Sequence, residues 1–102
     1  GLAMSSRNVY LSPMERQEAR TLFLALELAR ERIRMHERRA PALIGLLRQQ
    51  ISESPSARID YVAIVDAKSL EPVWRLRGRV AILLAVFIGN TRLIDNLLVD
   101  VP

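Results

Sequence analysis

The side chains best suited to chemistry lie within the first eight residues, Gly1-Leu2-Ala3-Met4-Ser5-Ser6-Arg7-Asn8. The hydroxyls of Ser5 and Ser6, together with the backbone amides around them, can donate hydrogen bonds to one anion. The guanidinium of Arg7 can add two parallel, charge-assisted hydrogen bonds to the same anion. Ser-Ser-Arg occurs by chance in many loops, so on its own this segment is only weak evidence for a phosphate or carboxylate site.

Carboxylates also stand in pairs along the second half of the chain. Asp60 pairs with Asp66 at a six-residue separation, and Asp95 is followed by Asp100. A general acid and base need such pairs, but these residues lie on or beside predicted strands. We therefore expect them to form salt bridges or to protect strand edges.

A basic cluster surrounds the only tryptophan. Arg75, Arg77 and Arg79 alternate along the chain next to Trp74, and such a pattern can grip a nucleic-acid backbone. The favoured interpretation is a solvated strand edge that discourages aggregation. A stand-alone arginine-rich module that binds nucleic acid remains the alternative function.

Composition excludes several kinds of catalytic site. The chain of 102 residues has no cysteine, which removes disulfides, thiolate zinc sites, iron-sulfur clusters and cysteine nucleophiles. Its only histidine, His36, would have to serve alone in any serine-histidine triad or histidine-ligated metal centre. We expect His36 to be an ordinary surface residue and predict no metal ligand.

Charge says little about partners. Fifteen basic against eleven acidic residues give a net charge of +4, and Lys68 is the only lysine. Arginine suits phosphates, but it is also common on protein surfaces. The longest apolar run, Val80–Ile88, is about half the length that spans a membrane, and the N-terminus does not resemble a secretory signal. We expect a cytoplasmic protein that binds neither nucleic acid nor membrane.

A capping box indicates where the first helix begins. In Ser12-Pro13-Met14-Glu15, serine and glutamate can each accept a hydrogen bond from the other's backbone amide, and proline suits the first helical position. The pattern predicts a long helix from about residue 13 to about Arg38. Its apolar stripe has three- and four-residue spacing: Ala19, Leu22, Phe23, Leu26, Ala29 and Ile33.

Leu24 and Leu28 form a second apolar row on this helix, offset from the first. A helix that is apolar on more than one side is buried from two sides. Either the small domain wraps around it, or a partner surface covers the second row, and that partner can be another copy of the chain.

The remaining elements follow from changes in hydrophobic period. Ala40-Pro41 breaks the first helix and precedes a shorter one, with an apolar side of Leu43, Ile44, Leu47 and Ile51. Residues 58–66 predict a strand covered on both faces at its centre. Its alternation places Ile59, Tyr61, Ala63 and Val65 on one side and Asp60, Val62, Ile64 and Asp66 on the other.

Two further apolar runs, residues 79–88 and 92–99, flank Gly89-Asn90-Thr91 and predict a β-hairpin. The whole chain, residues 1–102, is long enough for one domain. The order of helix, helix, strand and hairpin predicts an α+β fold, in which the two helices pack on a small, mostly antiparallel, three-stranded sheet.

Three segments together resemble a known family. GLAMSSRNVYLSPMERQEA, IDYVAIVD and GNTRLIDN, in this order and at these separations, resemble the C-terminal domain of the pantothenate synthetase (pantoate:β-alanine ligase) family. The resemblance spans residue 1 to about residue 98. It implies a ligase that condenses pantoate with β-alanine, using ATP and Mg²⁺, through a pantoyl-adenylate to give pantothenate, AMP and pyrophosphate.

The resemblance also implies roles for the first motif. Met4 would lie nearest the adenine, Ser5 and Ser6 would bind the phosphates, and Arg7 would bind them and act catalytically on the departing pyrophosphate. The positions Asp60, Tyr61, Arg92, Asp95 and Asn96 also match family motifs, and for them structural hydrogen bonds are expected.

The family's N-terminal nucleotide-binding domain, with its His-x-Gly-His signature, has no counterpart in this sequence. The resemblance therefore implies a C-terminal, lid-like domain of a larger ligase that is inactive alone, with ATP and Mg²⁺ bound mainly by the absent domain. The second apolar row would meet either that domain or another copy of the chain.

Overall fold

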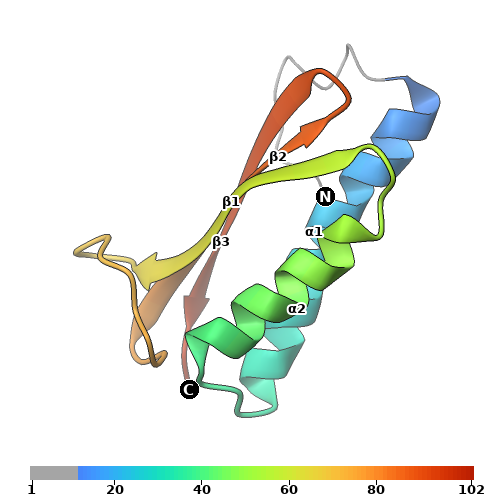
Figure 1. Cartoon of the computed structure of the whole chain (residues 1–102). Helices are drawn as coiled ribbons and strands as arrows, with labels where there is room; N and C mark the ends of the chain where they lie inside the picture. The colour runs from blue at the N-terminus through green and yellow to red at the C-terminus, as the bar shows by residue number, and fades with distance from the viewer. Residues whose placement is uncertain (1–11) are drawn as a thin grey trace.

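The computed structural model describes residues 12–102 of the chain. They form α1 (Pro13–Arg34), α2 (Ala40–Ser52), β1 (Ala57–Asp66), β2 (Arg79–Ile88) and β3 (Thr91–Asp100). The strands make one antiparallel sheet in the order β1-β2-β3, and both helices lie over the same face of it (Figure 1). The predicted α+β fold, with a long and a short helix on a three-stranded sheet, is confirmed.

The capping box sets the start of α1. The Ser12 hydroxyl accepts from the Glu15 amide, and the Glu15 carboxylate accepts from the Ser12 amide, both at 3.1 Å. Both bonds satisfy amides that the first helical turn leaves without an intrahelical partner.

The prediction that the first helix reaches Arg38 was wrong, because α1 ends at Arg34. The His36 amide bonds to the Ile33 carbonyl and the Glu37 amide to the Arg32 carbonyl, at 3.0 and 2.9 Å. Together with a φ of 75° at His36, these bonds make a Schellman motif, which satisfies the last carbonyls and ends the helix. The expected break at Ala40-Pro41 instead lies at the start of α2.

Arg38 joins the end of α1 to the end of the chain. Its guanidinium donates to the carbonyls of Ile33 and Glu37 at 2.7 and 3.0 Å, and to that of Pro102 at 3.3 Å. The negative end of the helix dipole also stabilises a cation at this position.

A β-bulge at Asp60 changes the predicted facing of β1. The register pairs Ile59 with Val86 and Tyr61 with Ala85, so Asp60 is an extra residue without a cross-strand partner. Ile59 therefore packs against the core together with Val62 and Ile64. The simple alternation, which grouped Ile59 with Tyr61, was wrong on this point because a sequence pattern of period two does not reveal the inserted residue.

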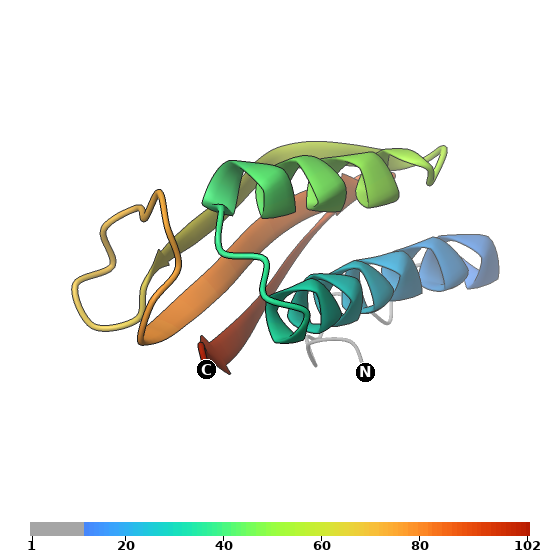
Figure 2. The same cartoon turned by 90° about the horizontal axis from the view of Figure 1, so that it is seen from below.

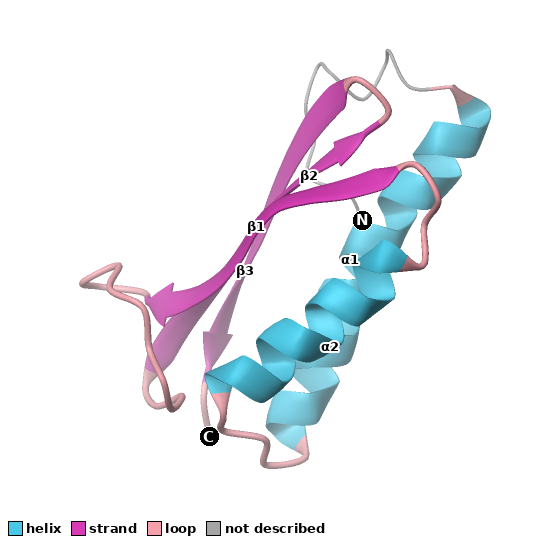
Figure 3. Ribbon diagram, viewed as in Figure 1, coloured by secondary structure: helices cyan, strands magenta, loops and turns pink. Residues whose placement is uncertain are grey.

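The core lies between the helices and one face of the sheet (Figure 2). It is formed by the stripe of α1, the apolar side of α2 and alternate residues of β2, among which Leu22, Leu47, Ile82 and Leu84 are almost fully buried. No described element covers the opposite face of the sheet (Figure 3). No helix in residues 12–102 is long and apolar enough to cross a membrane.

Candidate functional site

The predicted binding residues Met4, Ser5, Ser6 and Arg7 lie outside the described residues. The structure does describe the end of the molecule to which they are joined. There the start of α1, the turn between β2 and β3, and the connector between α2 and β1 come together.

The start of α1 packs on the β2–β3 turn. Gly89 has a φ of +60° at the first of the two turn residues, a conformation that type II′ hairpin turns use. A β-carbon at Gly89 would collide with the Glu15 carboxylate, the same group that completes the capping box. One carboxylate thus caps the helix and fits against the turn.

The connector is fastened to α1 by side chains. The Glu18 carboxylate accepts from the Ser56 amide at 2.9 Å, and the Ser54 hydroxyl donates to the Thr21 hydroxyl at 3.0 Å. The Ser56 carbonyl accepts from the Gly89 amide at 3.3 Å, which joins the connector to the hairpin turn. The other Glu18 oxygen is buried and has no hydrogen-bond partner among the described residues.

An ion pair spans the same end of the sheet. Arg92 on β3 donates through Nε and Nη2 to one Asp60 oxygen on β1, at 3.1 and 2.9 Å. Beside it, the Arg58 guanidinium lies 5.0 Å from the centre of the Phe87 ring, within reach of a cation–π interaction. The expected structural role of Asp60 and Arg92 is confirmed.

The other predicted carboxylates also have structural partners. Asp100 lies 3.5 Å from Arg79, and Asp95 accepts from the Asn96 amide at 2.8 Å. The amides of Ser69 and Lys68, bonded at 2.8 and 2.9 Å, hold the pKa of Asp66 below its ordinary value. Asp66 thereby organises the loop that follows β1.

The arginines of the basic cluster around Trp74 have different partners. Arg75 forms a backbone bridge with Arg39, whereas Arg79 pairs with Asp100. Trp74 itself is 79% exposed. The predicted strand edge was wrong: Arg75 and Arg77 precede β2, and Arg79 begins β2, which is the central strand of the sheet.

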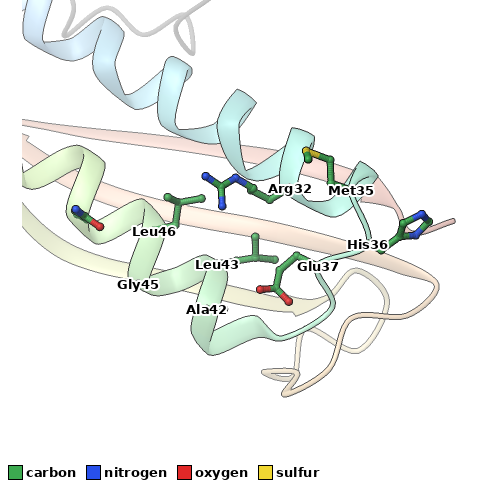
Figure 4. A pocket seen from close by; sticks show the side chains of 9 residues that line it. Arg32, Met35, His36, Glu37, Ala42, Leu43, Gly45 and Leu46 are labelled. Carbon is green, nitrogen blue, oxygen red and sulfur yellow. The ribbon is translucent and has the colours of Figure 1, made fainter.

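A surface hollow of about 760 Å³ lies between the helices at the far end of α1, lined by Arg32, Met35, His36, Glu37, Ala42, Leu43, Gly45, Leu46 and Gln49 (Figure 4). Its carboxylate is already occupied, because Glu37 binds Arg39 at 3.2 Å, and this bond lowers the pKa of Glu37. His36, as expected, is a surface residue. The hollow brings together no nucleophile and base.

The side-chain contacts described above stabilise the fold of residues 12–102. Within this range no three His, Cys, Asp or Glu side chains come together as metal ligands. By contrast, the serine hydroxyls and guanidinium of residues 5–7 are donors that suit phosphate oxygens.

Comparison with known proteins decides the family. The model of the family "Pantoate-beta-alanine ligase" matches residues 1–98. The chain belongs to the pantoate-β-alanine ligase family. It is 48% identical over 101 residues to the pantothenate synthetase of Moorella thermoacetica and 54% identical over 101 residues to that of Heliobacterium modesticaldum.

The fold agrees with that of solved ligase structures. The crystal structure of pantothenate synthetase from Thermus thermophilus matches 95% of this chain with a TM-score of 0.87 and 36% identity, and the match covers 35% of that protein's chain. The matches to the Moorella and Heliobacterium proteins include 99% of this chain but only 36% of theirs. The chain thus spans about a third of the relatives that it matches.

Sequence reasoning missed two features of the sheet in this ligase-family chain. One is the bulge at Asp60, which positions that residue for the ion pair with Arg92. The other is the uncovered face of the sheet. Its signal was present in the sequence, since Leu83, Phe87, Ile94 and Leu98 alternate with the core residues of their strands.

Proposed function

We propose that this chain is the phosphate-loop domain of a pantoate-β-alanine ligase. The complete enzyme would join pantoate and β-alanine at the expense of ATP, forming pantothenate, AMP and pyrophosphate. The family match over residues 1–98 carries the proposal, because it includes the Met4–Arg7 segment.

In the first half-reaction a pantoate carboxylate oxygen would attack the α-phosphorus of ATP. The bond to the bridging oxygen breaks, and that oxygen leaves with pyrophosphate and its growing negative charge. Arg7, helped by Ser5 and Ser6, would bind this charge more strongly in the transition state than in bound ATP. In the second half-reaction the β-alanine amine attacks the acyl carbon of pantoyl-adenylate and displaces AMP.

The described part of the chain supports this role by providing a rigid base for the loop. Arg7 precedes Ser12 by five residues, and five residues span at most about 18 Å. The loop is therefore tied to the end where Glu15, Glu18 and Gly89 fasten three segments together. A loop on such a base can be brought over a nucleotide held elsewhere as one body.

The remainder of the site would come from the rest of a longer polypeptide. The relatives are about three times as long as this chain. We propose that a preceding nucleotide-binding domain holds most of ATP, Mg²⁺ and pantoate, that this chain closes over them, and that the enzyme acts in the cytoplasm.

The proposal predicts that residues 1–102 alone release no AMP from pantoate, β-alanine, ATP and Mg²⁺, because they supply only one loop of the ATP site. The complete polypeptide should release AMP only when both pantoate and ATP are present. A coupled AMP assay on both proteins tests this. Turnover by residues 1–102 above a no-enzyme control would contradict the fragment role, and a folded complete polypeptide without turnover would contradict the ligase activity.

A further inference from the structure

The sheet face opposite the helices is largely apolar. Its apolar residues come from all three strands: Tyr61, Leu83, Phe87, Ile94 and Leu98, with the half-buried Ala63 and the buried Val65, Ala81 and Ala85 between them. One exposed polar residue, Asn96 opposite Leu83, lies among them on β3. Ile94 and Leu98 are 52% and 51% exposed. We call these residues the outer patch. Antiparallel sheets with one free face normally place polar residues there, so an apolar free face indicates a partner.

Charged pairs border the outer patch at both ends. Arg92 binds Asp60, and Arg58 lies over Phe87, at the end where α1 begins. Arg79 and Asp100 face each other at the opposite end. An apolar centre that contains aromatic residues, within a rim of arginines and carboxylates, is the usual anatomy of a protein–protein interface.

We propose that the outer patch is the surface on which the preceding domain of the complete polypeptide docks when this domain closes. This inference rests on the proposed function, since it concerns the closing movement that brings Arg7 to ATP. It names the face that closes and the residues that guide it.

The occupant follows from the length and entry point of the remaining chain. The matched relatives carry nearly two thirds of their length outside the region that this chain covers. The described chain starts at Ser12, beside the β2–β3 turn, because Glu15 packs against Gly89. The described chain thus begins at the end of the sheet where Arg58, Asp60 and Arg92 lie.

Tethering favours this occupant over a second copy. A domain linked through a short segment has an effective concentration in the millimolar range, far above that of a free copy. The second apolar row on α1 is a smaller candidate surface, because it consists of Leu24, which is 58% exposed, and Leu28, which is half-buried. The described domain does not cover Leu24, and the row contains no aromatic residue. We use it as the control surface.

Single cysteines test the proposal in the complete polypeptide. Leu98→Cys and Ile94→Cys report on the outer patch, and Leu24→Cys, at a position of similar exposure, is the control. Each maleimide labelling rate is divided by the rate of the same variant unfolded in urea, and mass spectrometry identifies the labelled site. Thermal unfolding of each variant checks folding. The labelling is followed with and without ATP, Mg²⁺ and pantoate.

With the substrates present, Leu98→Cys and Ile94→Cys should label at least tenfold more slowly than Leu24→Cys. Equal rates at the three positions, or protection of Leu24→Cys instead, would overturn the proposal. Protection that disappears on dilution to a monomer would assign the face to a second copy and overturn it as well. Labelling does not depend on turnover. Unprotected cysteines in an active enzyme overturn the docking face alone, and protected cysteines in an inactive one overturn the ligase function alone.

Discussion

His36 occupies a backbone conformation that a β-carbon disfavours. Its φ of 75° is the left-handed conformation that closes the Schellman motif at the end of α1, and glycine is the usual residue there. The left-handed region costs a residue with a β-carbon about 1 to 2 kcal/mol. Histidine at this position therefore weakens the domain without taking part in any described chemistry.

His36→Gly should raise the free energy of unfolding by about 0.5 to 1 kcal/mol, the relief of strain less the extra freedom of glycine in the unfolded chain. Urea unfolding of the domain measures the change. His36→Ala is the control, because alanine removes the imidazole and keeps the β-carbon, and it should give no gain. Equal stabilisation by both variants would mean that the side chain, and not φ, is the cause.

At the scale of elements, the two glycines with positive φ within residues 12–102 allow a matched comparison. A β-carbon at Gly78 (φ +65°) would meet nothing within 4 Å, whereas one at Gly89 (φ +60°) would meet the Glu15 carboxylate. Glu15 must shift to make room, and its other carboxylate oxygen is the one that accepts from the Ser12 amide. The start of α1 and the β2–β3 turn are therefore coupled through one side chain.

Gly89→Ala should destabilise the domain by about 0.5 to 1 kcal/mol more than Gly78→Ala, because both introduce strain at positive φ but only the first disturbs the helix cap. Denaturant unfolding of the two variants gives the difference. In a Glu15→Ala background the difference should vanish. If it persists there, the coupling through Glu15 is wrong.

The loop between β1 and β2 depends on one ionised carboxylate. The amides of Ser69 and Lys68 lower the pKa of Asp66 in the folded domain. The ionised Asp66 therefore stabilises the domain fully above the pKa that an aspartate has in the unfolded chain, about 4. This stabilisation is lost as the pH falls through the lower pKa of the folded state. Asp66→Asn should be less stable than the wild type at neutral pH, and the difference should shrink below about pH 4. Urea unfolding across this range tests it; a difference independent of pH would contradict the role of the charge.

How far the sequence predicts the structure also differs between elements. Ser12 and Glu15 revealed the start of α1 because a capping box is a local pattern, and Gly89 marked the hairpin for the same reason. The end of α1 was missed because His36 stands where glycine is expected. The bulge at Asp60 was missed because it depends on which residues of β1 face the core.

For the whole molecule, the fold follows from hydrophobic periodicity, but the candidate site does not. Residues 4–7 are recognisable only through the family motif, since Ser-Ser-Arg has no distinctive spacing. The outer patch has an alternating pattern, yet alternation alone does not tell which strand face the helices leave uncovered. What covers that face, and what completes the phosphate site, would both lie in the remaining two thirds of the polypeptide.

The most direct test of the account is the rate of each half-reaction in the complete enzyme with Arg7→Ala, measured in single turnovers. Loss of one preorganised donor to the leaving pyrophosphate should slow adenylate formation by roughly a hundred- to a thousandfold. Arg7→Lys should recover part of this loss, because it keeps the charge without the forked geometry.

Attack of β-alanine on preformed pantoyl-adenylate should be nearly unchanged in Arg7→Ala, because pyrophosphate has already departed. This selective loss in the first half-reaction is the result the account predicts. Equal slowing of both half-reactions, or a loss confined to ATP affinity, would contradict it and would show that Arg7 positions the domain rather than stabilising the leaving group.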